Sequence, residues 1–298
     1  MIELRPCVSD ADLEAWRRVR IAVIPYERTD SVEELRRNTT PDRLMLLAYC
    51  DGVLAGSGVG GRSDTASGFA IPRVLPEQRR HGVGTTLLFA LAEHVEALGY
   101  PDLGVSTDDE GSLAFARRFG FEETGRQVEQ VRAVAADEPL PRVPDGIEIV
   151  SLAVRPKLHA RTYHELALAV FEDIPTPRKI EISLEDWKGS WFPTLDGSFA
   201  ALAGDEIVGC AGLVRDFDRA DRAENTLTAV RRDWRGRGLA RALKETVIAW
   251  ASANGIRELY TWTQTGNENM QAVNAKLGYV TGHVSISLRR PLPLPQHR

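Results

Sequence analysis

Three features are scarce or absent in this 298-residue sequence, and each absence narrows the class of protein. The three cysteines, Cys7, Cys50 and Cys210, form no CxxC pair and no cluster with histidine, so neither a disulfide framework nor a structural zinc site is expected. No apolar run approaches the ~18 residues that cross a bilayer. The formal net charge is −5, which does not favour binding to nucleic acid or anionic lipid. We therefore expect no metal, no nucleic-acid partner and no membrane partner.

The first residues, Met1–Arg5, lack the charged and apolar segments of an export signal. Together with the scattered cysteines, this favours a soluble protein of the reducing cytoplasm. Lysine supplies only 5 of the 37 basic residues, which we attribute to the codon bias of a GC-rich genome. Hydrophobic residues make up 43% and charged residues 27%, as in ordinary globular proteins, and the length favours two domains or one large domain.

A proline-rich stretch divides the chain near its middle. Pro139, Pro141 and Pro144 lie within residues 133–146, and three prolines so close together cannot continue a helix or a central strand. The sequence therefore predicts a first domain at residues 1–135, a linker at residues 136–146 and a second domain at residues 147–298.

Matching segments on the two sides of this linker indicate a duplication. Val74–Gly84 and Val230–Ala240 both read V-x₄-R-x-x-G-x-G/A, and Arg118–Phe121 matches Lys276–Tyr279 further along. Each copy predicts an opening strand, a helix, three strands, a long amphipathic helix after the glycine motif, a short strand, a helix and a closing strand. The expected fold class is α/β (α+β), with a mixed, largely antiparallel sheet flanked by helices in each copy.

The repeated glycine motif predicts a phosphate-binding turn. Glycine lets the backbone turn tightly, and the unpaired N–H groups at the start of the following helix attract an anion. A dinucleotide fingerprint is excluded because Leu87 and Arg241 stand where its third glycine belongs, and no Gly-Lys-Ser/Thr sequence exists for a Walker A loop. A glycine-capped turn without a ligand is the alternative interpretation. The repetition of the motif at matched positions argues against it.

At these residues the sequence resembles the GCN5-related N-acetyltransferase (GNAT) family. The family signature Q/R-x-x-G-x-G/A is met twice, and a later N-x₁₀-G-F/Y segment runs from Asn267 to Tyr279, with Asp109 at the Asn position of the first copy. The resemblance covers nearly the whole chain as a tandem pair. It implies acetyl-CoA as the donor, with its pyrophosphate on the glycine turn and its pantetheine paired with the strand edge at Ala229–Val230, where one N–H group would polarise the thioester carbonyl.

The cofactor-binding residues that the resemblance implies fall in both copies. In the first copy they are Val74, Arg79, Arg80, His81, Gly82, Val83 and Gly84. In the second copy they are Ala229, Val230, Arg231, Arg235, Gly236, Arg237, Gly238, Leu239, Ala240 and Asn267.

The resemblance also implies a reaction, the direct attack of an amine on the thioester, which needs a base. Glu224 matches the base position of many family members, whereas the first copy has Gly68 there. Asp216 and Asp218 are alternative bases, and a solvated carboxylate without a catalytic role is the simpler interpretation of Glu224.

The residue that is a tyrosine acid in many members is Ala116 in the first copy and Asn274 in the second. A tyrosine acid at this position is therefore ruled out. Asn274 or water is expected to serve the leaving thiolate in the second copy. We expect the first copy to be non-catalytic, although its intact turn can still bind coenzyme A.

The acceptor side is less well defined by the sequence. Glu172, Asp173 and Trp187 follow the first helix of the second copy, where family members build the acceptor wall, and acidic groups near aromatic rings suit a cationic amine. A helix cap and buried aromatic rings are the alternative. We expect a small-molecule primary amine as the acceptor, in a monomer with an internal pseudo-dimer or in a homodimer. The two alternatives are an acetyl-CoA sensor without turnover and an enzyme that uses a longer acyl-CoA.

Overall fold

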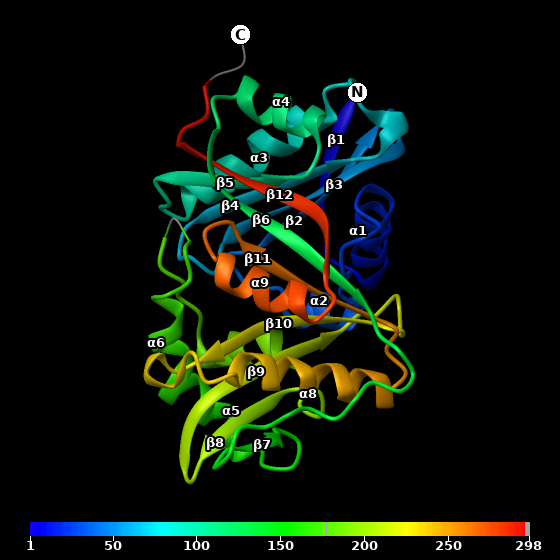
Figure 1. Ribbon diagram of the computed structural model, residues 1–298. Coiled ribbons are helices and arrows are strands. Elements are labelled where there is room, and N and C mark those ends of the chain that lie inside the picture. The colour runs from blue at the N-terminus through cyan, green and yellow to red at the C-terminus, as the bar shows by residue number, and fades with distance from the viewer. Residues whose placement is uncertain (177, 296–298) are drawn as a thin grey trace. The chain divides into compact units, whose positions relative to one another are not determined.

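The computed structural model describes residues 1–176 and 178–295, which form two compact units (Figure 1). Unit 1 comprises Met1–Thr124 together with the chain from Ile286 onward, and unit 2 comprises Gly125–Ser285. Each unit is a mixed sheet flanked by helices, which confirms the predicted fold class. In the described ranges, no helix combines the length and apolar character that a membrane crossing requires.

In unit 1 the sheet has the strand order β1-β2-β3-β4-β5-β12. All neighbours are antiparallel except β4 and β5, which are parallel and pair only at Gly68 and Phe69. The elements that begin in this unit are β1 (Ile2–Pro6), α1 (Asp10–Val23), α2 (Val32–Arg37), β2 (Leu44–Cys50), β3 (Val53–Arg62), β4 (Gly68–Val74), a 3₁₀ turn (Pro76–Gln78), α3 (Val83–Ala97), β5 (Asp102–Thr107), α4 (Glu110–Arg118) and β6 (Glu122–Ala133).

Unit 2 repeats this architecture with the strand order β6-β11-β10-β9-β8-β7, and its parallel pair is β10 with β11. Its elements are β7 (Glu148–Ser151), α5 (Lys157–Thr162), a π-helical turn (Tyr163–Ala167), α6 (Leu168–Phe171), α7 (Leu184–Asp186), a second π-helical turn (Trp187–Trp191), β8 (Phe199–Ala203), β9 (Glu206–Arg215), β10 (Arg222–Val230), a 3₁₀ turn (Arg232–Trp234), α8 (Leu239–Ala253), β11 (Glu258–Gln264), α9 (Glu268–Lys276) and β12 (Val280–Pro291).

Each sheet has an apolar layer on both faces because alternate residues of a strand point to opposite sides. In β2, Leu46 packs toward α3, while its neighbour Leu47 packs in the cluster that contains α1 and α2. In unit 2, Ala201 belongs to the layer under α8, while Leu202 belongs to the layer under α5 and α6. The long helices α3 and α8, which follow the glycine motifs, therefore lie on the opposite face from the helices that precede β2 and β8.

The closing strands are exchanged relative to the predicted copies. Strand β6, expected to close the first copy, pairs with β11 of unit 2, and β12, expected to close the second copy, pairs with β5 of unit 1. The predicted boundaries at residues 135 and 147 therefore do not delimit the compact units. The physical reason is that strand pairing uses backbone groups, so the edges of β5 and β11 accept the closing strand of either copy. A repeat in the sequence identifies matching strands but not the sheet in which each one pairs.

Candidate active site

In unit 2, the glycine motif forms a tight turn between β10 and α8. Gly236 and Gly238 have φ values of +76° and +83°, a region that L side chains rarely adopt, and Gly238 precedes the helix without a side-chain cap. The first helical hydrogen bond runs from the Ala242 N–H to the Gly238 carbonyl. The preceding N–H groups, from Leu239 to Arg241, point out of the helix start, which is the arrangement that binds a phosphate.

The same turn recurs in unit 1 at a conformational cost. Gly82 has a φ of +87° and precedes α3, and the Thr86 N–H donates to its carbonyl. Arg80 occupies the position of Gly236 and is held at a φ of +68°, which costs about 1–2 kcal/mol for a residue with a side chain. His81 is exposed beside it, and Val83 and Gly84 begin the helix against Val74. The predicted turn residues of the first copy are thus brought together.

Three of the four arginines around the unit 2 turn are paired with carboxylates of the same unit. Arg231 donates to Asp233 and Glu206, and Arg232 donates to Asp173 at 2.9 Å. Arg235 also donates to Asp173, while its Nε donates to the Val230 carbonyl at 3.1 Å. Arg237 lies over the ring of Trp234 at 4.6 Å.

The contacts of Asp173 differ from the acceptor role predicted for it. The hydrogen bond from Arg232 is the main reason that the pKa of this carboxyl lies below its usual value, so the group is an anion matched by two cations. Glu172, half exposed, lies 3.6 Å from Lys179 and 3.9 Å from Arg232. Both acidic groups therefore neighbour the arginines of the turn, and Asp173 orients Arg232 and Arg235.

Strands β10 and β11 diverge next to this turn. Their backbone ladder covers only Arg222, Ala223 and Glu224, and beyond it the Thr261 hydroxyl of β11 donates to the Asn225 carbonyl at 2.9 Å. A β-bulge follows Glu224, since Glu224 faces Val214 of β9 while Leu227 faces Gly212. The divergence leaves one edge of β10 unpaired between the bulge and the glycine turn.

The backbone groups on that open edge can be assigned by alternation. In an antiparallel strand, the N–H and C=O of one residue point to the same side, and successive residues alternate. The Arg231 N–H donates to Val208 of β9, and a Cβ atom placed on Gly209 of β9 would lie 3.0 Å from the Ala229 carbonyl oxygen. The N–H groups of Val230 and Thr228 therefore face the open edge, whereas those of Ala229 face β9. Counting back from the strand end could have identified Thr228 in place of Ala229.

Glu224 lies at the apex of the divergence. Its side chain is half-buried, and the Tyr260 hydroxyl on β11 donates to its Oε2 at 3.3 Å. The alternative base Asp216 is buried and lies 3.5 Å from Nη1 of Arg222, and its Oδ1 accepts from the Asp218 N–H. Because Arg222 already neighbours Asp216, Glu224 is the better candidate for taking a proton.

A buried polar group supports the bulge from the α8 side. Asn225 donates to the Gly212 and Leu227 carbonyls, and its Oδ1 accepts from Lys244 at 2.7 Å and from Thr228 at 3.1 Å. Lys244 on α8 is 1% exposed. The corresponding residue of unit 1 is Leu88, so this network belongs to unit 2 alone. Its only sequence signal is a lysine inside an otherwise apolar helix face.

Unit 1 has the same divergence of strands but lacks the groups that line it in unit 2. The Leu75 N–H donates to Ala55 of β3, so by alternation the open edge of β4 carries Val74 and Pro72. Pro72, the counterpart of Thr228, has no N–H group. At the Glu224 position, a Cβ atom on Gly68 would collide with Val95 Cγ1 and lie 2.7 Å from the Asp102 carbonyl oxygen, so no carboxylate fits there.

Three predicted residues of unit 2 have structural contacts that differ from their predicted roles. Trp187 is fully buried and stacks on Phe192 with ring centroids 4.2 Å apart, so its indole is part of the core and is not exposed to an acceptor substrate. Asn274 is fully buried, and its Nδ2 donates to Gln130 at 2.8 Å. The amide group predicted to donate to the leaving thiolate is therefore already hydrogen-bonded within the protein. Asn267 caps α9 by accepting the Met270 N–H at 3.3 Å.

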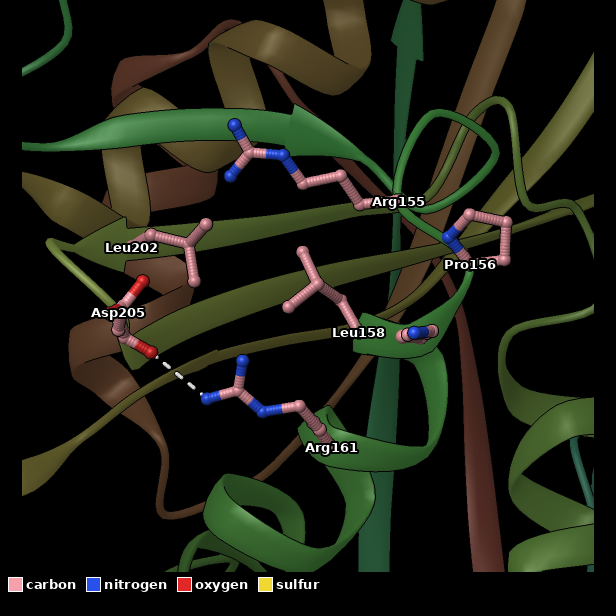
Figure 2. A pocket seen from close by; sticks show the side chains of 7 residues that line it. Arg155, Pro156, Leu158, Arg161, Leu202 and Asp205 are labelled. Atoms are coloured by element: carbon pink, nitrogen blue, oxygen red, sulfur yellow. Dashed lines mark hydrogen bonds between the residues drawn. The ribbon is translucent and has the colours of Figure 1, made fainter.

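A separate pocket of about 410 Å³ lies between α5 and the β8–β9 hairpin of unit 2 (Figure 2). Leu158 and Leu202 line it, and Arg161 donates to the Asp205 carbonyl across its edge. None of its lining residues belongs to the turn or to the Glu224 region. Among the described residues, no group of three or more His, Cys, Asp or Glu side chains could hold a metal ion.

Comparison with known proteins places this geometry in a family. The model of the acetyltransferase (GNAT) family matches residues 11–121 and 160–279. Mycothiol acetyltransferase of Actinosynnema mirum is 26% identical over 246 residues, covering 78% of this chain and 79% of that protein. The enzyme of the same name from Catenulispora acidiphila is 29% identical over 216 residues, covering 69% of this chain and 67% of that protein.

Solved structures show the same fold over the whole chain. A tandem GNAT protein from the clavulanic acid biosynthesis pathway has a TM-score of 0.79 at 18% identity and covers 98% of both chains. A GCN5-related N-acetyltransferase from Sphaerobacter thermophilus has a TM-score of 0.75 at 20% identity, covering 97% of this chain and 95% of the other. The chain therefore belongs to the acetyltransferase (GNAT) family, carries two copies of the family domain in tandem, and is an N-acetyltransferase of that type.

Proposed function

We propose that unit 2 transfers the acetyl group of acetyl-CoA to a primary amine of a small molecule, and that unit 1 has no turnover of its own. The observation that carries this proposal is the convergence of three groups at the β10–β11 divergence. These are the Glu224 carboxylate and the outward-facing N–H groups of Thr228 and Val230. In unit 1, the corresponding positions hold Gly68 and Pro72.

The residues of unit 2 fit a thioester of coenzyme A. The N–H groups at the start of α8 and the guanidinium groups of Arg235 and Arg237 suit a pyrophosphate. The open edge of β10 offers backbone donors at Val230 and Thr228 to an extended amide chain and to the thioester carbonyl. The strand that would otherwise occupy this edge has diverged, so binding displaces no sheet hydrogen bond.

In the proposed reaction, Glu224 accepts a proton from the ammonium form of the acceptor, directly or through water. The free amine then attacks the thioester carbonyl carbon to form the C–N bond, and its nitrogen gives up a second proton to solvent. The C–S bond breaks, and the leaving thiolate takes up a proton from solvent. The Thr228 N–H stabilises the charge that develops on the carbonyl oxygen, because a fixed donor needs no reorganisation during the reaction. Since a thiol of pKa ~8.5 is a better leaving group than an amine, a strong protein acid is not required.

The acceptor is a small molecule in this proposal, in keeping with the enzyme name of the curated relatives. Unit 1 keeps the turn geometry and can hold a coenzyme A derivative without reaction. An enzyme with a longer acyl donor is the second candidate, since the open edge of β10 does not by itself limit the acyl length.

The test is release of free thiol from acetyl-, propionyl- and succinyl-CoA in the presence of a panel of primary amines. We expect acetyl-CoA to be the best donor and Glu224→Gln to lower kcat by about 10²-fold at neutral pH. Glu165→Gln, which removes a carboxylate from an exposed ion pair with Arg161, is the matched control. Full turnover by Glu224→Gln would reject the assignment of the base, and absence of turnover with every donor and amine would favour an acetyl-CoA sensor.

A further inference from the structure

Unit 1 contains an uncompensated positive charge on the α1 face of β4. Arg73 is 5% exposed, and its Nε and Nη1 atoms are buried without a hydrogen-bond partner. Its guanidinium lies over the ring of Trp16, with Cζ 5.2 Å from the centroid. Burying a guanidinium without a paired anion is unfavourable. The stabilisation by the aromatic ring is far smaller than the hydration free energy that burial removes.

The acids near Arg73 are paired with other arginines or lie closer to them. Burial is the main reason that the pKa of Arg73 is lowered; Arg20 and Arg43 lower it further, and Glu27 alone among the acids raises it. Glu27 is itself paired with Arg20 at 2.9 Å, and Asp30 is paired with Arg28 at 2.7 Å. Around Arg43, by contrast, Asp30, Asp42 and Asp64 offset the charge in part. Among the described residues, none of these acids is therefore paired with Arg73 itself.

A second unpartnered polar group lies beside Arg73. Ser57 is directly opposite Arg73 on β3, so the two side chains share one face of the sheet with Cβ atoms about 5 Å apart. Ser57 is fully buried, and its Oγ has no hydrogen-bond partner. The Nε of Arg43 is likewise buried without a partner. Polar atoms on three residues of one region are thus left unsatisfied, although buried polar groups are almost always hydrogen-bonded.

The equivalent pair in unit 2 shows that the fold itself does not require these groups. There, Cys210 faces Ala229, and both are enclosed in the apolar cluster that contains Trp187 and Phe192. In unit 1, β4 is free of β5 beyond Phe69, so the segment that carries Arg73 borders the open edge of the strand. A polar pair at this place is a property of unit 1 alone.

We propose that unit 1 binds a small carboxylate-bearing ligand, whose carboxylate pairs with Arg73 and accepts a hydrogen bond from Ser57. A carboxylate supplies the acceptor oxygens that the Arg73 guanidinium lacks, and a guanidinium recognises it through charge-assisted hydrogen bonds. Trp16 covers the guanidinium face and holds its plane in place. This gives the unit without a candidate base a binding role that is independent of acetyl transfer by unit 2.

The test is thermal unfolding of the full chain with sodium succinate as the probe, against sodium chloride and sodium phosphate at equal ionic strength. Arg73→Met removes the charge and keeps an unbranched side chain under Trp16. Arg215→Met is the matched control, because Arg215 also lies over an indole, that of Trp250, but neighbours Asp196. We expect succinate to raise the melting temperature of the wild type and of Arg215→Met saturably, and to have at least tenfold weaker apparent affinity for Arg73→Met.

The ligand-free proteins provide a second readout that does not depend on the probe. If Arg73 lacks a partner, Arg73→Met is as stable as the wild type or more stable without succinate. A clearly lower melting temperature for ligand-free Arg73→Met would reveal a structural partner and overturn the proposal. An equal succinate shift in wild type and Arg73→Met would overturn it as well, and a response to phosphate alone would overturn the assignment to a carboxylate.

Discussion

The buried lysine beneath the β10 bulge gives a prediction whose size can be worked from the structure. Lys244 is 1% exposed, its Nζ donates to Asn225 at 2.7 Å, and it lies 5.3 Å from the centroid of the Tyr279 ring. Within residues 1–176 and 178–295 it forms no ion pair. Loss of hydration lowers the pKa of Lys244 from 10.5 to about 7.

The perturbation is Lys244→Met, which keeps the chain length and removes the titrating group. Because the folded-state pKa lies below the unfolded-state value, the unfolded chain binds more protons between about pH 7 and pH 10.5, so stability rises with pH in that window. The shift of 3.5 units corresponds to a ceiling of roughly 5 kcal/mol, at about 1.4 kcal/mol per unit. Relative to that of Lys244→Met, the free energy of unfolding of the wild type should therefore increase as the pH rises through this window. It should be lowest at or below pH 7.

The assay is urea unfolding of both proteins at several pH values between about 6.5 and 10, taking the difference in free energy of unfolding so that other groups cancel. Lys276→Met, at an exposed lysine of α9, is the control and should show no such difference. A difference between wild type and Lys244→Met that stays constant across this range would mean that the folded protein keeps Lys244 charged and hydrated, contrary to the lowered pKa.

Two further predictions concern glycines. Gly238→Ala should weaken acetyl-CoA binding, measured by calorimetry, more than Gly255→Ala does. Both residues have a positive φ with no atom within 4 Å of an added Cβ, but only Gly238 forms the turn. Equal loss of affinity in the two variants would argue against the turn as the binding site. Gly68→Ala should destabilise unit 1 by about 1–3 kcal/mol because its Cβ collides with Val95, and an unchanged melting temperature would contradict this.

Much of the architecture follows from patterns that a single sequence contains. Alternation and helical periodicity predict the strands and long helices around each glycine motif, and the tight turn expected at each motif is formed with positive φ angles at Gly82 and Gly238. The short helix α2 and the exchange of β6 and β12 were not predicted. A helix of six residues, of which only Val32 and Leu35 are apolar, gives little periodicity. Strand exchange depends on backbone edges that no side-chain pattern records.

The candidate site was predictable only where a role depends on position along the chain. Counting from the end of β10 predicts Glu224 as the base. The same counting places the outward-facing N–H on Thr228 and not on Ala229, once the side of the strand to which each N–H points is considered. The roles of Asp173 and Trp187 depend on which groups the fold brings together. Asp173 meets Arg232 from a segment 59 residues away, and Trp187 is enclosed by Phe192 and its neighbours.

We propose that acetyl transfer takes place at the open edge of β10 in unit 2. Removing the N–H group of Thr228 is the most direct test of this proposal. Thr228→Pro removes that N–H without removing a bond to β9, and Pro72 shows that the corresponding strand of unit 1 accommodates proline. Thr228→Val keeps the N–H and loses only the hydroxyl that donates to Asn225.

The decisive measurement is kcat for thiol release at saturating acetyl-CoA with the best amine, compared between these two variants. We expect kcat to fall by about 10²–10³-fold for Thr228→Pro, with a much smaller effect for Thr228→Val and little change in the melting temperature of either. A folded Thr228→Pro variant whose kcat equals that of Thr228→Val would contradict this proposal.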